Sequence, residues 1–416
     1  MTNTPDWKSK INPLVLGIQP SGIRRFFDLV AEMKGVISLG VGEPDFVTPW
    51  HIREACMYSL EKGYTMYTSN QGLLELREAI ARNLAVAYGV SYNPRQEILI
   101  TVGVSEGLDL AFRAILCPGD EVLIPEPSYV SYAPVTVMAG AKPVFLKTSA
   151  ENGFQINAAM VEKAITPKTK ALILCNPNNP TGATLDRKHL LEIAEVVRAH
   201  DLIFISDEIY GRLTYVGEHT CVSSLPGLRD RTILLNGFSK SYAMTGWRVG
   251  YAAGNQDFIL AMTKIHQYTM LCAPVTAQAA ALEALRNGES GMKKMVDQYN
   301  RRRHLVIQAL QEIGLPCGEP RGAFYAFPDI RSTGLSSEDF AQQLLQEEKV
   351  AVVPGNAFGE QGEGFVRCSY SASINDLTEA FKRMNSFVGR KVRKGKVLTF
   401  SPGKNEIKKE DICQTM

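Results

Sequence analysis

The chain has 416 residues, of which 45% are hydrophobic, and its formal net charge is +2. The length predicts two to three domains with ample core, and the balanced charge gives no indication of a nucleic-acid or membrane partner. The first residues lack the features of a signal peptide, and no apolar run is long enough to span a membrane. Eight cysteines occur without a Cys-x-x-Cys pair, which predicts a cytoplasmic protein with reduced thiols and no metal site.

Short apolar runs alternate with helix-like segments between about residues 70 and 285. The segment 187–200, for example, has apolar residues at helical spacing. This alternation is typical of an α/β domain with a mostly parallel sheet covered on both faces. Ligands of such sheets bind beyond the carboxyl ends of the strands. The strand-like runs are 97–102, 121–124, 143–146, 171–175, 202–206 and 233–235.

The pattern changes after about residue 287, where a long helical stretch at 291–314 precedes shorter strand-like and helical segments. This change predicts a smaller α+β domain, with the N-terminal segment packed against it. The lysine-rich end of the chain lacks periodicity and is expected to be a flexible tail. The predicted division is an N-terminal segment at 1–48, a large cofactor-binding domain at 49–286, a small domain at 287–390 and a tail at 391–416.

Two of the strand ends lead into loops that suit a ligand. The sequence Gly-Val-Ser-Glu-Gly at 103–107 follows the first run and opens a helix, so its backbone N–H groups could seat a phosphate. The loop at 176–182 contains two prolines and a glycine, which could hold the amide of Asn179 in one orientation. Either loop could also be a plain turn.

Asp207 closes the run 202–206, where a carboxylate would be costly to bury without a cationic partner. The protonated ring nitrogen of a pyridine cofactor would be such a partner, and a helix N-cap is the alternative. Tyr210 follows three residues later and could reach a phenolic oxygen on the same ring.

Lys240 follows the apolar run 232–235, and Arg248 comes eight residues later. A lysine fixed beside an anion-binding arginine suits a phosphorylated aldehyde, because the amine forms a Schiff base and the guanidinium binds the phosphate. A Ser-Lys pair is more often a solvated surface feature. The hypothesis therefore depends on the other strand ends supplying the remaining groups.

Several separated motifs occur together in one order. The chain resembles the class I pyridoxal-phosphate aminotransferases of fold type I, in the aspartate and aromatic aminotransferase branch, from about residue 11 to 388. The resemblance implies a seven-stranded, mostly parallel sheet in the large domain. The motifs that carry it are Gly-Glu-Pro-Asp-Phe at 42–46, Tyr67 before 72–77, 176–182, 207–210, Ser239-Lys240, and Arg367.

The resemblance implies pyridoxal 5'-phosphate as the cofactor and a role for each matching residue. Lys240 would be the Schiff-base lysine and proton shuttle, Asp207 the partner of the ring nitrogen, and Tyr129 the aromatic ring stacked on the cofactor, with Ile209 on the other face. Asn179 and Tyr210 would bind the ring oxygen. The phosphate would be held by Val104, Ser105, Glu106, Ser239 and Arg248, and by Tyr67 of a second subunit in a homodimer with shared sites.

The substrate's α-carboxylate would be bound by Arg367, Asn179 and the Gly42 backbone. The implied reaction transfers an amino group from an L-amino acid to a 2-oxo acid by a ping-pong cycle. Family analogy also suggests pocket positions near the substrate side chain. They are Ile23, Arg24, Asn70, Tyr129 and Gln267.

The sequence departs from the family pattern at two places. Gly237 stands where relatives often have a serine or threonine phosphate ligand, and no arginine for a distal acid is found at 265–269. Strict aspartate specificity is therefore not expected, and aromatic, acidic, diaminopimelate-like and broad specificity stay open. A pyridoxal-phosphate lyase, such as a C–S lyase, or a related synthase is the alternative reaction. A non-enzymatic regulator with this fold is a third hypothesis.

Overall fold

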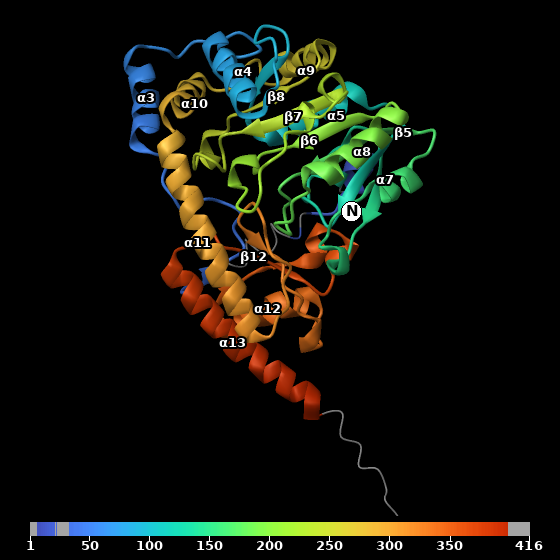
Figure 1. Ribbon diagram of the computed structural model, residues 1–416, viewed down its shortest axis with the longest axis vertical. Coiled ribbons are helices and arrows are strands. Elements are labelled where there is room, and N and C mark those ends of the chain that lie inside the picture. The colour runs from blue at the N-terminus through green and yellow to red at the C-terminus, as the bar shows by residue number, and fades with distance from the viewer. Residues whose placement is uncertain (1–5, 21, 23–32, 398–416) are drawn as a thin grey trace, which may run out of the picture.

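The computed structural model describes residues 6–20, 22 and 33–397 (Figure 1). A large α/β unit lies above a smaller unit in this view, and the long helix α11 (Glu289–Ile313) runs from one to the other (Figure 1). None of the helices in the described part of the chain has the length and apolar character needed to cross a membrane.

The large unit is built on a seven-stranded sheet with the strand order β2-β8-β7-β6-β5-β3-β4. All neighbours from β7 through β4 are parallel, whereas β8 runs antiparallel to both β7 and β2. The expected mostly parallel sheet of seven strands is therefore confirmed. Its strands are β2 (Ile98–Thr101), β3 (Glu121–Glu126), β4 (Lys142–Lys147), β5 (Thr169–Cys175), β6 (Ile203–Asp207), β7 (Thr232–Gly237) and β8 (Gly250–Ala253).

Both faces of this sheet are covered by helices, which explains why its strands are almost continuously apolar. Leu172 and Phe204 point into a core formed with α7 and α8, whereas their neighbours Ile173 and Ile205 point into the core that contains α5 and α9. This alternation is the two-residue period of a strand buried on both sides. The helices of the large unit are α3 (Trp50–Glu61), α4 (Leu74–Tyr88), α5 (Gly103–Ile115), α6 (Tyr132–Met138), α7 (Ala158–Ala164), α8 (Arg187–Ala199), α9 (Gln256–Thr269) and α10 (Val275–Asn287).

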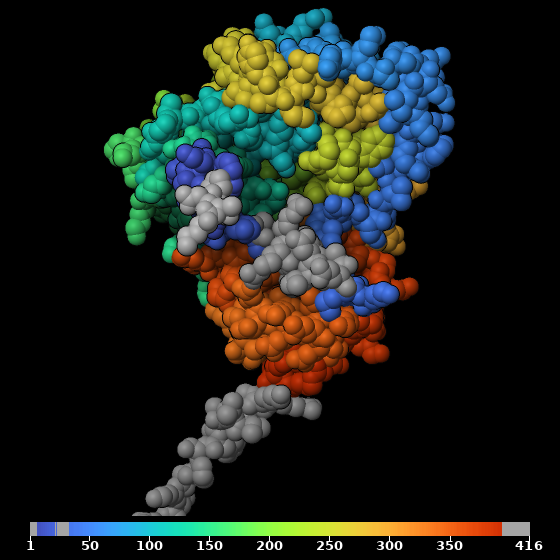
Figure 2. All heavy atoms as spheres, turned by 180° about the vertical axis from the view of Figure 1, so that it is seen from behind, coloured from blue at the N-terminus to red at the C-terminus, as the bar shows by residue number. Residues whose placement is uncertain are grey.

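The small unit contains a three-stranded antiparallel sheet in the order β11-β12-β9. The N-terminal segment joins this unit through β1, which pairs in parallel with β10, Ile37 lying opposite Val350. The strands are β1 (Ile37–Ser38), β9 (Tyr325–Ala326), β10 (Val350–Ala351), β11 (Val353–Pro354) and β12 (Val366–Ser369), and the helices are α12 (Ser337–Glu348) and α13 (Ile374–Val397). The short helix α1 (Pro13–Leu16) instead lies against α6 of the large unit (Figure 2).

Local sequence signals explain where several helices begin and end. The Asp186 side chain accepts a hydrogen bond from the His189 N–H at the start of α8, and Ser336 caps α12 in the same way. Helix α11 ends at Gly314, whose φ of 81° is in the left-handed region that glycine adopts without a Cβ penalty. Short 3₁₀ helices complete the fold at η1 (Trp7–Lys10), η2 (Ala150–Asn152), η3 (Gly211–Leu213), η4 (Val222–Ser224), η5 (Arg229–Arg231), η6 (Thr245–Trp247), η7 (Arg331–Thr333), η8 (Gly355–Phe358) and η9 (Glu360–Gly362).

The end of the chain differs from the expected flexible tail in its first seven residues. Helix α13 continues to Val397, and the amine of Lys391 donates hydrogen bonds to Gln343 and Glu347 on α12. These contacts with α12 stabilise helix at the start of a segment in which the sequence shows no helical periodicity. The rest of the expected tail, 398–416, lies outside the described residues.

Candidate active site

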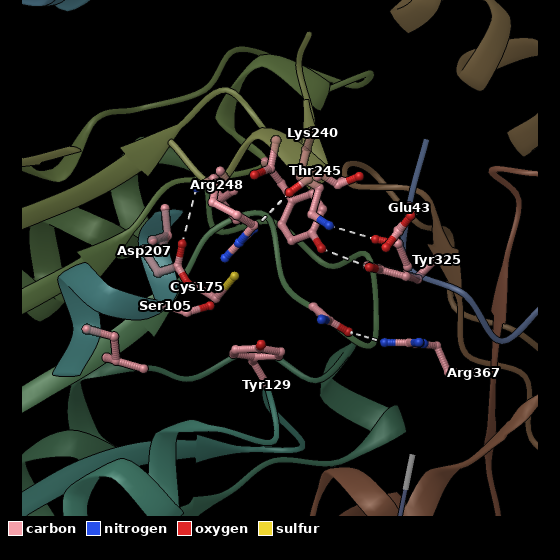
Figure 3. Close-up of a pocket in the computed structure, with 18 residues that line it drawn as sticks. Glu43, Ser105, Tyr129, Cys175, Asp207, Lys240, Thr245, Arg248, Tyr325 and Arg367 are labelled. Carbon is pink, nitrogen blue, oxygen red and sulfur yellow. Dashed lines mark hydrogen bonds between the residues drawn. The ribbon is translucent and has the colours of Figure 1, made fainter. Parts of the chain in front are cut away.

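A cavity of about 560 Å³ lies at the carboxyl edge of the large sheet and is closed from the other side by the small sheet (Figure 3). Its wall contains Lys240, Asp207 and Arg248 from the large unit and Arg367 from β12. The sequence separates these groups by up to 160 residues. Asp207 and Lys240 come together because the parallel strands β6 and β7 end at the same edge, Arg248 lies in the connection that returns to β8, and the small sheet brings Arg367.

Lys240 is brought to the cavity by the turn that follows β7. Its Nζ donates a hydrogen bond to the Gly42 carbonyl oxygen at 2.7 Å. Burial lowers the pKa of this amine to about 8, with further lowering by Arg367 and Arg248 and opposition from Glu43 and Asp207. A lysine with this pKa is neutral in about a tenth of the molecules at pH 7 and in about half at pH 8, whereas an ordinary lysine is almost entirely charged. Nucleophilic and basic roles require this neutral form.

Asp207 is the last residue of β6 and is almost fully buried. Its carboxylate accepts hydrogen bonds from the Tyr132 hydroxyl at 2.7 Å and from the Ile209 N–H at 3.2 Å. Burial raises the pKa of Asp207 to about 6, although both hydrogen bonds act in the opposite direction. Among the described residues no cation forms an ion pair with it, so the cavity holds a buried acid that a ligand cation would stabilise.

The N-terminus of α5 and Arg248 form one end of the cavity. Val104 and Ser105 lie in the first turn of α5, where backbone N–H groups have no partner within the helix. Arg248 has a φ of 55° and donates a hydrogen bond from Nη1 to the Thr245 carbonyl oxygen. A Cβ at Gly103 would lie 2.7 Å from Arg248 Nη2, so the absence of a side chain at 103 lets the guanidinium approach the helix end. Ser239 also lines this cavity.

Glu106 is turned away from the cavity, although it lies in the same helical turn. One carboxylate oxygen accepts a hydrogen bond from the Val102 N–H at 2.5 Å, and the other lies 2.7 Å from Nδ1 of His266, a fully buried residue of α9. Of the expected phosphate contacts, Glu106 is therefore the one in this helix whose side chain does not line the cavity. The Glu106 carboxylate therefore contacts the imidazole of His266 and not the end of the cavity that Arg248 and the N-terminus of α5 form.

The middle of the cavity is lined by side chains that suit a flat ring. Tyr129 presents its ring to the space, and Ile209 and Tyr210 also line it (Figure 3). The Tyr210 hydroxyl lies 2.8 Å from the hydroxyl of Tyr325. Tyr325 was not singled out from the sequence, because nothing in the run 322–327 distinguishes it from a core aromatic residue.

Arg367 and Asn179 meet at the opposite end from Arg248 (Figure 3). Arg367 donates hydrogen bonds from Nη1 to Asn179 Oδ1 at 2.9 Å and from Nη2 to the Gly40 carbonyl oxygen at 2.6 Å. Its guanidinium has no carboxylate partner among the described residues and faces the cavity. A planar cation that already has its orientation fixed is suited to binding a carboxylate in a fork.

Several residues considered from the sequence lie elsewhere. Tyr67 is 81% exposed and does not line the cavity of its own chain. Asn70 and Gln267 are also outside this wall, and the Asn70 amide donates a hydrogen bond to the Leu271 carbonyl oxygen. Ile23 and Arg24 lie outside the described residues.

Sequence reasoning missed other members of the wall. Tyr132 is the hydrogen-bond donor to Asp207, and Glu43, Cys175 and Thr245 line the cavity. Cys175 could have been found from its position, because it is the last residue of β5 and therefore lies at the same edge as Asp207. Tyr132 carries no comparable signal, since it reaches the acid from the first turn of α6.

The residues of the cavity fit pyridoxal 5'-phosphate. One end offers an arginine and a helix N-terminus for a dianion, and the centre offers a buried acid without a cation and a lysine with a lowered pKa. A second arginine stands free for a substrate carboxylate. No cluster of histidine, cysteine and acidic side chains that could hold a metal ion occurs in the described part of the chain.

Comparison with known proteins identifies the family to which the chain is similar. The family model described as aminotransferase class I and II matches residues 34–384. The chain is 54% identical over 380 residues to a putative aminotransferase, YugH, of Bacillus subtilis, covering 91% of this chain and 98% of that protein. It is 48% identical over 377 residues to an aspartate aminotransferase of Pyrococcus abyssi, covering 90% and 97%.

A solved structure extends this similarity to the fold. The aromatic aminotransferase of Pyrococcus horikoshii superposes with a TM-score of 0.85 at 46% identity, covering 89% of this chain and 99% of that one. The likeness therefore spans both units and the cavity between them.

Proposed function

The chain belongs to the class I and II aminotransferases, which are pyridoxal-phosphate enzymes, and we propose that Lys240, Asp207 and Arg367 are the central groups of its active site. The observation that supports this assignment most is their convergence on one cavity from the end of β6, the turn after β7 and strand β12 of the small sheet. When bound, the cofactor supplies an aldehyde for covalent attachment and a cationic ring that accepts electrons from the substrate's Cα. The protein's own residues have to bind, orient and move protons around it.

In this proposal the phosphate is held by Arg248, by Ser105 and Ser239, and by backbone N–H groups of α5 that include Val104. The close approach of Arg248 to Gly103 supports it, because the cation and the helix N-terminus then act on the same anion. Gly237 lacks a hydroxyl, and Ser239 supplies one two residues later in the cavity wall.

The ring is oriented by Asp207, Asn179, Tyr210 and Tyr129. Asp207 stabilises the protonated ring nitrogen by opposite charge, and the Tyr132 hydroxyl keeps its carboxylate in place. Tyr129 offers a flat face for stacking. The Tyr210 hydroxyl and the Asn179 amide are proposed donors to the ring oxygen.

Lys240 is the proposed covalent attachment point and proton carrier. Its pKa of about 8 gives the neutral amine needed to take the proton from the substrate's Cα, and its hydrogen bond to the Gly42 carbonyl oxygen shows a neighbouring group that can hold the amine aside. Arg367 then binds the α-carboxylate and fixes which Cα bond faces the lysine. The second substrate, a 2-oxo acid, uses the same groups in the reverse direction.

A homodimer with shared sites is part of the proposal. Large apolar side chains gather on the exposed surface of the segment around α3, where Tyr58, Tyr64, Met66 and Tyr67 are all more than half exposed. Such a patch is typical of an interface between subunits. In the dimer, Tyr67 would reach the phosphate bound by the partner subunit. The described cysteines are all free thiols, which supports the cytoplasm as the compartment.

For the donor, we propose broad specificity that includes aromatic amino acids. Among the described wall residues, Arg248 and Arg367 are the only arginines, and both already have a role, so none is left for a distal carboxylate. The Pyrococcus relatives named above are an aspartate and an aromatic aminotransferase.

The test is a panel of amino donors against 2-oxoglutarate and pyruvate. An amino acid should bleach the aldehyde absorbance of the loaded protein, and a 2-oxo acid should restore it. If the amino acid bleaches the absorbance, ammonia is released and turnover continues without an oxo acid, the reaction is instead that of a lyase. Turnover with aspartate alone would refute the broad specificity without affecting the aminotransferase reaction.

A further inference from the structure

Tyr325 lies in the wall of the cavity, where it contacts Tyr210 in the middle and Arg367 at one end. It belongs to β9 in the small sheet, is 1% exposed and lines the cavity on the same side as Arg367 (Figure 3). None of the roles proposed above uses this residue, although it contacts groups from three separate segments of the chain.

The first contact is made by the ring. The Arg367 guanidinium carbon lies 4.5 Å from the centre of the Tyr325 ring and 4.9 Å from the centre of the Phe358 ring. Arg367 forms hydrogen bonds only through its two terminal nitrogens, and its Nε is buried without a partner. The aromatic rings therefore add to the two hydrogen bonds in holding the guanidinium in its orientation.

The second contact is made by the hydroxyl, which lies 2.8 Å from the Tyr210 hydroxyl. Each phenol has a single proton to donate. If Tyr210 donates its proton to the cofactor's ring oxygen, as proposed above, the contact between the two phenols needs the proton of Tyr325. Tyr325 then donates to Tyr210 and makes it a stronger donor.

The third contact is with the N-terminal segment. A Cβ at residue 42 would lie 2.5 Å from the Tyr325 hydroxyl oxygen, so the phenol occupies the space that Gly42 leaves free. The Gly42 carbonyl oxygen accepts the hydrogen bond of Lys240. The position of Tyr325 is thus fixed by packing as well as by its hydrogen bond.

We propose that Tyr325 is a positioning residue with two separable roles: its ring orients Arg367 for the substrate carboxylate, and its hydroxyl strengthens the hydrogen bond that Tyr210 donates. This inference rests on the proposed roles of Arg367 and Tyr210. It predicts that the two halves of one side chain affect two different measurements.

The experiment compares Tyr325→Phe, Tyr325→Leu and Phe358→Leu with the wild-type enzyme loaded with pyridoxal phosphate. Carboxylate affinity is measured as the KM of the best donor and as the inhibition constant of maleate or 3-phenylpropanoate, which carry no amino group. The state of the ring is followed as the pH midpoint of the visible absorbance of the loaded enzyme. Cofactor content and melting temperature report whether each variant is folded.

Tyr325→Phe should leave KM and the inhibition constant within about 2-fold, because the ring remains. It should raise the absorbance midpoint by about 0.1–0.7 pH unit, because the hydrogen bond from Tyr210 remains and loses only the roughly 10–30% by which a neighbouring donor strengthens it. Tyr325→Leu should raise the midpoint in the same way and also raise KM and the inhibition constant about 2- to 30-fold, the range of a cation–π contact. Phe358→Leu should raise KM without moving the midpoint.

An unchanged midpoint in Tyr325→Phe would overturn the role of the hydroxyl. Unchanged carboxylate affinity in Tyr325→Leu would overturn the role of the ring, whatever the result for Phe358→Leu. If Tyr325→Leu does not fold, Tyr325→Met, which keeps a large apolar side chain without an aromatic face, decides this point. Either result with a wild-type enzyme that transaminates leaves the proposed function intact. A wild-type enzyme whose absorbance does not respond to any donor would instead refute the assignment of the active site.

Discussion

Asp207 carries the structure's most direct consequence for stability. Without the cofactor, this carboxyl group is buried beside hydrogen-bond donors but no cation, and its pKa is raised from the ordinary 3.8 to about 6. The native state therefore keeps a proton between pH 4 and 6 that the unfolded chain has already released. Stability then falls as the pH rises through this window, and the whole cost is present above it.

The size of the effect follows from the shift. At about 1.4 kcal/mol for each pH unit, the ionised acid lowers the free energy of unfolding by about 3 kcal/mol at pH 8 and by roughly half of this at pH 5. Asp207→Asn removes the titration. The cofactor-free variant should gain about 1.5 kcal/mol relative to wild type between pH 5 and 8, or roughly 2 °C in melting temperature for a chain of this length.

The assay is thermal unfolding of both cofactor-free proteins across this pH range. Asp329→Asn is a matched control, because the hydrogen bonds from Arg331 outweigh the burial of that carboxyl group and lower its pKa, and arginine keeps its charge throughout this pH range. Its difference from wild type should stay constant. Added pyridoxal phosphate should stabilise the wild type more than Asp207→Asn. A difference between Asp207→Asn and wild type that does not grow with pH would refute the burial argument.

Four further outcomes are expected. Lys240→Ala should carry no borohydride-reduced cofactor on the peptide around residue 240, as checked by mass spectrometry; an adduct that persisted there would place the attachment elsewhere. Arg367→Lys should raise KM about 10- to 100-fold with little change in cofactor absorbance, because it loses a forked, charge-assisted contact; equal losses in KM and cofactor content would contradict this. Arg248→Gln should weaken cofactor binding in equilibrium dialysis about 10- to 100-fold, and retention like that of wild type would exclude it from the phosphate seat. Tyr67→Phe should lose cofactor faster at unchanged dimer mass in sedimentation, and a monomeric wild type would end the shared-site proposal.

The sheet could be predicted from the sequence because burial on both faces makes its strands visible as apolar runs. The runs at 171–175 and 202–206 differ from β5 and β6 by two residues at most. The direction of β8 could not be read in this way, since an apolar run carries no sign of whether its neighbour is parallel. The connection from β7 to β8, residues 238–249, is at the lower limit for a crossover to a parallel strand and is thus only a weak indication of the reversal.

The site residues that could be predicted from the sequence are those whose position along the chain determines their position in the fold. Asp207 and Lys240 lie at or just after the ends of strands, so the edge of the sheet brings them together. The side chain of Glu106 depends on a partner 160 residues away, His266, which no local pattern announces. Tyr132 and Tyr325 contribute through contacts between distant segments, and a single sequence gives no access to these.

The antiparallel direction of β8 also determines which residues of the site move together. Because β8 returns beside β7, Lys240 and Arg248 both lie in the single connection 238–249 between these two strands of the large sheet. Arg367, in contrast, belongs to β12 of the small sheet. Rocking between the two units would move Arg367 relative to Lys240 and Arg248 while the spacing between Lys240 and Arg248 stayed constant. With the roles proposed above, the contacts with the substrate carboxylate would then change more than those with the phosphate.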